Sequence, residues 1–110
     1  MNALDVLGDP VRRRILDLLA RGETSAGELA AAVQEEFGIS HPAVSHHLRV
    51  LREAGFVAVR VDGPRRIYRL RPDGFDDVDE WLDRFRRIWA GPLEALATEV
   101  ARGKRERKKT

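Results

Sequence analysis

Cysteine is absent from this 110-residue sequence, which excludes a disulfide scaffold and any thiolate metal site. Long apolar stretches are missing too, since runs such as residues 56–59 fall far short of the roughly 20 residues that a membrane span needs. The first residues lack the basic segment and the apolar core of a secretion signal. These absences predict a protein of the reducing cytoplasm that has no membrane partner.

The length fits one domain, and a composition of 43% hydrophobic and 35% charged residues predicts a globular chain. The net charge of +2 conceals an uneven distribution. Residues 40–71 carry seven arginines against two acids, and residues 102–110 carry six basic residues against one acid, whereas the other segments are acidic. Concentrated positive charge is typical of a small nucleic-acid binder, although a mixed solvated surface would give the same charge pattern.

Apolar spacing predicts two helices near the start of the chain. Leu4 and Leu7 mark a short first helix. The second is expected over residues 10–20, because Asp9 is a good N-cap and the following proline suits the first helical position. Gly22 is expected to cap its C-terminus. The arginines at positions 12–14 are expected to lie mainly off the apolar face.

Two more helices are predicted before the sequence period changes. Residues 24–28 have the pattern of a capping box and begin the third helix, which ends at Gly38. The fourth helix is capped by Ser40 or His41 and ends at residues 54–55. Its core face is formed by three residues at helical spacing: Val44, Leu48 and Leu51.

A β-hairpin with a basic loop is predicted to follow. Residues 56–61 are rich in β-branched side chains, residues 62–66 form a charged turn, and residues 67–71 alternate with period two. After a break at residues 72–74, apolar residues recur at three- and four-residue steps as far as position 100. They predict a long helix with a heptad-like seam.

Gly91 and Pro92 interrupt that seam and are expected to kink or restart the helix. The residues from Arg102 onward carry charge without apolar periodicity, which predicts disorder. The expected organisation is therefore one folded domain over residues 1–101 and a basic tail over residues 102–110.

Helix, turn, helix and hairpin in this order predict a winged helix-turn-helix, a mainly α fold with a small β-hairpin. With one face of the fourth helix committed to the core, the opposite face presents small or polar side chains: Pro42, Ser45, His46 and Arg49. Arg49 can bond guanine bidentately, and the amides at the start of this helix favour a phosphate. Arg65 and Arg66 at the hairpin tip are placed for the minor groove or the DNA backbone.

The sequence also resembles the ArsR/SmtB-type bacterial transcriptional repressors. The closest match is Ser-His-Pro-Ala-Val-Ser-His-His-Leu at residues 40–48 with Leu-Arg-Glu-Ala-Gly-Phe-Val at residues 51–57. Residues 7–16, residues 28–30 and Tyr68-Arg69-Leu70 add to a resemblance that spans about residues 3–100.

This resemblance implies a homodimeric repressor that binds a palindromic operator in double-stranded DNA, with the helix from Ser40 to Arg52 as its reader. The residues expected to contact DNA are Ser40, His41, Pro42, Ala43, Ser45, His46, Arg49, Arg52, Arg65 and Arg66. The first and last helices are expected to form the dimer interface through Leu4, Leu7, Val78, Trp81, Leu82, Phe85, Trp89, Leu93 and Leu96.

No metal site or cofactor is predicted. The cysteine motif of the family's metal sensors falls at residues 28–32, where Glu28 is the one residue with ligand atoms, and the last helix has acids but no histidine. The three histidines do not share one helix face. Among them, His46 is the better DNA candidate, and packing is favoured for His47. The acids at residues 76–83 are best explained as support for a helix N-terminus.

Three functional hypotheses remain open at this point. The leading one is a metal-independent DNA-binding repressor, and the lack of a nucleophile or phosphate loop argues against an enzyme. The second is a winged-helix scaffold for protein interactions, whose long helix docks a partner. The third is a repressor with an unrecognised metal or small-molecule effector site. The aromatic stripe around Phe85 is interpreted as dimer core in preference to a ligand pocket.

Overall fold

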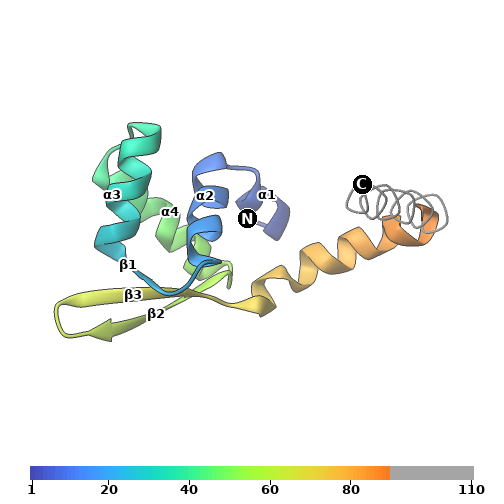
Figure 1. The fold of residues 1–110 in the computed structure, drawn as a ribbon. Helices are drawn as coiled ribbons and strands as arrows, with labels where there is room; N and C mark the ends of the chain where they lie inside the picture. The colour runs from blue at the N-terminus through green and yellow to red at the C-terminus, as the bar shows by residue number, and fades with distance from the viewer. Residues whose placement is uncertain (90–110) are drawn as a thin grey trace, which may run out of the picture. The chain divides into compact units, whose positions relative to one another are not determined.

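The structure is a computed structural model that describes residues 1–89; residues 1–78 form one compact unit, and residue 79 begins a second. The elements of the first unit are α1 (Ala3–Leu7), α2 (Pro10–Leu19), β1 (Thr24–Ser25), α3 (Ala26–Phe37), α4 (His41–Glu53), β2 (Val57–Asp62), β3 (Arg65–Leu70) and the 3-10 turn η1 (Pro72–Phe75) (Figure 1). Among the described helices, none combines the length and the apolar content that a membrane crossing requires.

Side-chain caps begin α2 and α4 where the sequence predicts. The Asp9 carboxylate accepts hydrogen bonds from the amides of Val11 and Arg12, at 2.8 and 3.2 Å, so α2 begins at Pro10. The Ser40 hydroxyl accepts one from the Ala43 amide at 3.2 Å and starts α4. The predicted cap at the other end of α2 is wrong. Ala20 is the C-cap residue, and Gly22 lies in the turn beyond it.

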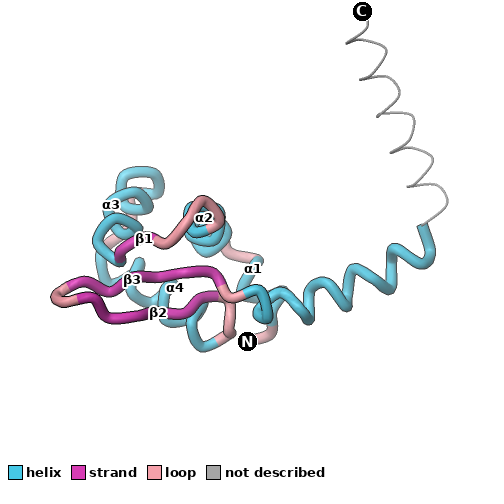
Figure 2. The backbone as a smooth tube through the Cα atoms, turned by 60° about the horizontal axis from the view of Figure 1, so that its bottom comes forward, coloured by secondary structure: helices cyan, strands magenta, loops and turns pink. Residues whose placement is uncertain are grey.

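A three-stranded antiparallel sheet of order β1-β3-β2 lies beside the helices (Figure 2). Its β2–β3 part is the predicted hairpin, paired from Val57 with Leu70 to Asp62 with Arg65. Gly63 has a φ of 59°, which the two-residue turn between the strands requires. The sequence pattern does not predict the third strand, because β1 contains only two residues, at positions 24 and 25, and pairs with residues more than 40 positions away.

Ser25 therefore belongs to β1 and also caps α3. Its hydroxyl accepts a hydrogen bond from the Glu28 amide at 3.2 Å, as the predicted capping box requires. The reciprocal half of the box is replaced by another contact, since the Glu28 carboxylate lies 3.6 Å from the guanidinium of Arg65 in β3. The pattern at residues 24–28 thus predicts the start of α3 correctly and the role of Glu28 wrongly.

One hydrophobic core joins all four helices to the sheet. Its fully buried side chains include Val6, Ile15, Leu29, Val33, Val44, Leu51, Phe56 and Val57. The predicted core face of α4 is confirmed, because Val44, Leu48 and Leu51 are at most 5% exposed. The prediction for α2 needs one correction. Arg12 does not lie off the apolar face in solvent: its side chain is buried and tied to α1 by hydrogen bonds.

Phe75 ends η1 and does not begin the long helix. Its ring packs edge-on against Phe56, with centroids 4.8 Å apart. This close approach depends on Gly74, where a Cβ atom would overlap the Gly55 carbonyl oxygen and lie 2.6 Å from the Phe56 Cα. Residues 76–89 are helical. Positions 90–110, which include Leu93, Leu96, the predicted kink and the basic tail, lie outside the described residues.

In the second unit, the described residues continue this helix. The rings of Trp81 and Phe85 have centroids 4.7 Å apart, and those of Phe85 and Trp89 are stacked at 5.4 Å. Aromatic residues four positions apart therefore form a stripe along one side of the helix, as the apolar spacing predicts.

Candidate nucleic-acid interface

The α4 residues predicted to contact DNA lie on the side of the helix that faces away from the core. Nine of the ten predicted DNA-contact residues of α4, its cap and β3 are exposed, and Ala43 is half-buried. The division is set by helical period: because Val44, Leu48 and Leu51 are buried, the residues on the opposite side of the helix, Pro42, His46 and Arg49, face solvent. The Ser40 hydroxyl is occupied as the acceptor of the cap bond, so it retains a hydrogen to donate.

A groove of about 340 Å³ lies between α4 and β3. It is lined by residues from three elements, namely His41, Ser45, Leu48, Arg49 and Arg52 of α4, Arg66 and Tyr68 of β3, and Ala26 at the start of α3. Three arginines thus line the groove together with the buried Tyr68. Such a groove attracts an anion, and its guanidinium groups can bond phosphate or a base edge.

The two wing arginines have different surroundings although they are neighbours in sequence. Arg66 and Tyr68 are two residues apart in β3, so both side chains project from the same face of the strand, and both line the groove. Arg65 projects from the other face, and its Nη2 lies 3.6 Å from the Glu28 carboxylate of α3. The structure therefore brings Arg66 to the α4 residues and Arg65 to an acid.

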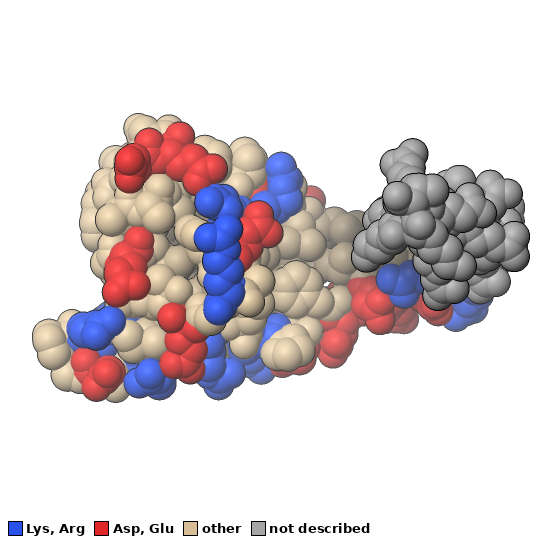
Figure 3. Space-filling view, viewed as in Figure 1, with Lys and Arg blue, Asp and Glu red and all other residues tan. Residues whose placement is uncertain are grey.

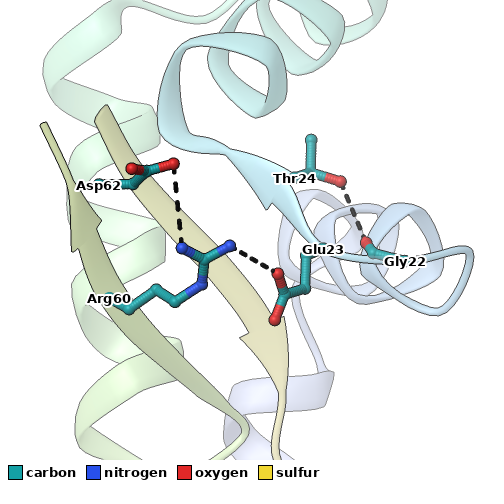
Figure 4. A network of polar contacts seen from close by, with 5 residues as sticks. All are labelled: Gly22, Glu23, Thr24, Arg60 and Asp62. Atoms are coloured by element: carbon teal, nitrogen blue, oxygen red, sulfur yellow. Dashed lines mark hydrogen bonds and ion pairs between the residues drawn. The ribbon is translucent and has the colours of Figure 1, made fainter. Parts of the chain in front are cut away.

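A second ion pair connects the hairpin to the turn before β1. Arg60 of β2 lies between two carboxylates, with Nη2 3.0 Å from Glu23 and Nη1 4.0 Å from Asp62 (Figure 4). In the same turn, the Thr24 hydroxyl donates to the Gly22 carbonyl at 3.1 Å. Along the hairpin, basic and acidic side chains are interspersed (Figure 3). The wing is thus less uniformly positive than its arginines alone indicate.

The two adjacent histidines of α4 make different contacts. His46 is exposed, and its Nδ1 lies 3.2 Å from Nη2 of Arg49, one turn later on the same face. His47 is half-buried, and its Nδ1 lies 3.3 Å from Nη1 of the buried Arg12. These contacts agree with the interpretation of His46 as a surface group and of His47 as a packing group.

The acids after η1 act as helix partners where the structure describes them. Asp79 pairs with Arg86 at 3.0 Å, and Asp83 pairs with Arg87 at 2.9 Å across one helical turn. Within residues 1–89, no three histidine, cysteine or acidic side chains come together as a metal site would need. The two ion pairs support the helix-supporting interpretation of the acidic run.

Several residues expected at a dimer interface are exposed apolar side chains. In the second unit, Trp81 and Leu82 are each 39% exposed and Trp89 is 50% exposed. In the first unit, Leu4 of α1 is also exposed, whereas Leu7 is half-buried and packs against the core. Contiguous apolar patches at an aqueous surface are characteristic of sites that contact another protein, whereas a single exposed apolar side chain is common.

Sequence reasoning missed three participants in the interface. Tyr68 and Ala26 line the groove, and Glu28 pairs with a wing arginine. The alternation of side chains along β3 could have predicted that Tyr68 and Arg66 share one face. The pairing of β1 with β3, which brings α3 to the wing, could not be predicted, because a strand of two residues has no recognisable sequence pattern.

Regulators of known sequence are similar to this chain, and a family model described as a helix-turn-helix domain matches residues 7–60. A helix-turn-helix-type transcriptional regulator of Mycobacterium tuberculosis, Rv2034, is 43% identical over 95 residues, which cover 86% of this chain and 82% of that protein. The transcriptional repressor SdpR of Bacillus subtilis is 37% identical over 84 residues, which cover 76% of this chain and 89% of that protein.

Solved structures agree with these sequence matches. A possible transcriptional regulator for arsenical resistance is 40% identical to this chain and has a TM-score of 0.67. The match covers 90% of this chain and 96% of that protein's chain. The homodimeric winged helix-turn-helix DNA-binding domain of Mb0332 from Mycobacterium bovis, a possible ArsR-family regulator, is 29% identical with a TM-score of 0.55, over 78% of this chain and 73% of its own.

Proposed function

This chain belongs to the ArsR/SmtB-type winged helix-turn-helix transcriptional regulators, and from this membership we propose that it is a homodimeric repressor that binds a palindromic DNA operator without a metal cofactor. Members of this class regulate transcription and are not enzymes, which confirms the prediction that the chain has no catalytic function. A repressor acts where the chromosome lies, so the proposal places the protein at the nucleoid in the cytoplasm.

The observation that carries the proposal is the groove in which Arg49 and Arg52 of α4 meet Arg66 of β3. In the proposed complex, the exposed face of α4 enters the major groove, where Arg49 bonds a guanine edge and Ser45 or His46 bonds a base or a phosphate. Arg66 then contacts the backbone of a strand that passes between α4 and the wing. In the first turn of α4, Pro42 has no amide hydrogen and the Ala43 amide donates to the Ser40 hydroxyl, so it is the positive end of the helix dipole that favours a phosphate there.

Dimerisation is proposed through α1 and the helix of residues 76–89. The stripe of Trp81, Leu82 and Trp89 is exposed in the single chain, and association with a second copy would remove this apolar surface from water. The Mb0332 domain, which is a homodimer, supports a homodimeric state for this chain. A twofold dimer presents two α4 helices, which is why the operator is proposed to be palindromic.

Selection of bound duplexes from a randomised pool tests the proposal without a prior guess of the operator. We expect an inverted repeat whose half-sites are about one helical turn, roughly 10 base pairs, apart. Fluorescence anisotropy then compares this duplex with a scrambled one and with the chain's own promoter region, with and without a chelator. Operator affinity should exceed scrambled affinity by about a thousandfold or more.

Metal independence is tested in the same titration. Because the chain has no cysteine, we expect zinc, cadmium, arsenite and chelator to leave operator affinity unchanged, and purified protein to contain no stoichiometric metal. Chelator-sensitive binding would instead favour the repressor with an unrecognised metal site. Equal, weak binding to every duplex would favour the interaction scaffold, in which exposed arginines on α4 have no reader role.

A further inference from the structure

Arg12 is the one charged side chain that is buried in the described part of the chain, with 8% of its surface exposed. Its Nε donates to the Val6 carbonyl at 2.7 Å, and its Nη2 donates to the Asp5 carbonyl at 3.2 Å. Both carbonyls belong to the C-terminal end of α1, where helix carbonyls lack partners within the helix. Arg12 of α2 therefore holds the end of α1.

The third contact of the same guanidinium reaches the reader helix. Nη1 of Arg12 lies 3.3 Å from Nδ1 of His47, which is 35 residues later in α4. A guanidinium has donors and no acceptor, so this hydrogen bond requires an unprotonated Nδ1 on His47. The imidazole is then neutral, with its proton on Nε2. A protonated His47 would turn a donor toward a donor and place two positive charges together.

Charged groups around His47 come from two helices. Burial lowers the pKa of His47 below its ordinary value of 6.5, and the positive charges of Arg12 and His46 act in the same direction, whereas the Asp9 carboxylate raises it. Asp9 and Arg12 belong to the start of α2, and the His46 ring lies 5.8 Å from the His47 ring. The balance favours the neutral imidazole that the hydrogen bond needs.

We propose that Arg12 and His47 are positioning residues for DNA binding: the neutral imidazole ties α4 to the end of α1, and its protonation releases α4 and weakens operator binding. The proposal rests on the proposed function, in which α1 belongs to the dimer interface and α4 reads DNA. A palindromic site requires the two α4 helices of a dimer at a defined separation. A tie between the interface helix and the reader helix sets that separation.

The pH profile of operator binding separates this role from a merely structural one. We expect wild-type affinity at constant ionic strength to fall severalfold or more between pH 7.5 and pH 5.5. The variant His47→Gln keeps a neutral acceptor that cannot titrate, so its affinity at pH 7.5 should be near that of wild type and its profile should be flat. The matched control His46→Gln should retain the fall.

Ordinary phosphate contacts predict the opposite sign. A positive charge gained on the exposed face of α4 adds a phosphate contact and strengthens binding as the pH falls. The proposal would be overturned if His47 becomes protonated between pH 7.5 and pH 5.5 while the operator affinity of the wild-type protein stays constant or rises. A fall that persists undiminished in His47→Gln would also overturn it.

A measurement without DNA keeps the failure of this proposal distinct from failure of the proposed function. Nitrogen chemical shifts of the imidazoles report which ring nitrogen carries the proton. We expect His47 to be protonated on Nε2 at pH 7.5, and Arg12→Lys, which loses the fork, to change the shift of Nδ1. A His47 protonated on Nδ1 refutes the tie itself. If that shift is as expected but no duplex binds at pH 7.5, the proposed function fails and the contact is structural alone.

Discussion

Arg49 and His46 contact each other on the exposed side of α4, with Nη2 of Arg49 3.2 Å from Nδ1 of His46. Because the guanidinium donates, the imidazole accepts, and the contact orients the fork of Arg49. We expect Arg49→Ala to weaken operator binding by about 1–3 kcal/mol, the discrimination of one bidentate base contact, and to change scrambled-duplex binding little. Anisotropy titrations with both duplexes measure this.

The same pair predicts non-additivity. Since His46 acts partly through Arg49, the double variant His46→Ala with Arg49→Ala should lose less than the sum of the single losses. Equal losses of operator and scrambled affinity in Arg49→Ala would show that this arginine contacts phosphate and not a base.

The wing arginines should contribute unequally. Arg66 lines the groove, whereas the charge of Arg65 is partly balanced by Glu28. We expect Arg66→Ala to weaken operator and scrambled binding alike. The slope of log affinity against log salt concentration should become less steep by roughly 0.9 for each phosphate that the variant no longer neutralises. A dimer carries two copies of the variant and therefore loses this contact twice. Arg65→Ala should change the slope less.

Removal of the competing acid gives the converse result. Glu28→Gln frees Arg65 and removes a negative charge near the wing, so it should strengthen binding to both duplexes and steepen the salt dependence. The double variant Glu28→Gln with Arg65→Ala should lose the part of this gain that comes from Arg65. A Glu28→Gln protein with weaker binding would mean that the ion pair holds the wing in its binding geometry.

The aromatic stripe of the helix at residues 76–89 should hold the dimer together. Leu82→Glu or Trp89→Glu places a charge in a surface that the dimer would desolvate, so we expect a monomer at micromolar concentration and loss of tight operator binding. Arg87→Glu changes the charge on the far side of the same helix and should remain dimeric. Sedimentation velocity distinguishes the two states. A monomeric wild-type protein at these concentrations would contradict the assembly.

The approach of η1 to residues 55–56 should be sensitive to a single methyl group. Gly74→Ala forces the backbone apart, because its Cβ would overlap the Gly55 carbonyl oxygen, and we expect a loss of about 1–3 kcal/mol of unfolding free energy, the usual cost of overpacking. Gly27→Ala is the matched control, since a Cβ at this position in α3 would meet no atom within 4 Å. It should be neutral or stabilising by up to about 1 kcal/mol. Urea denaturation measures both, and a tolerated Gly74→Ala would show that η1 can shift freely.

Acid should destabilise the folded chain through His47. Its pKa is lower in the folded chain than the ordinary 6.5, so the unfolded chain binds the proton more readily as the pH falls through 6.5. The free energy of unfolding is therefore expected to decrease from pH 7.5 downward, and to level off once the pH passes below the lowered pKa. His47→Gln should show a smaller decrease in thermal unfolding experiments. An identical decrease in both proteins would assign the effect to other groups.

Local chemistry in the sequence determined most of the fold. Asp9 and Ser40 cap helices by bonds to amides two or three residues away, and Gly63 supports a two-residue turn. The period of Val44, Leu48 and Leu51 buries one face of α4 in the core, and the exposure of the opposite face, which is proposed to read DNA, follows from it. Such signals act within one or two turns, and they are therefore visible without tertiary structure.

Only the tertiary structure decided which distant residues meet. The packing of α2 against α4 decides whether the Arg12 side chain lies in solvent or against α1 and His47. The position of Arg12 in the sequence, next to the apolar face of α2, does not predict which of the two occurs. The different partners of Arg65 and Arg66 depend on the register of β3 and on the pairing of two residues in β1, which together bring α3 to the wing. The contact between Arg12 and His47 joins positions 35 residues apart, and β1 pairs with residues more than 40 positions away. These contacts form only when the core has placed both elements, because a burial pattern specifies which face turns inward and not what that face meets.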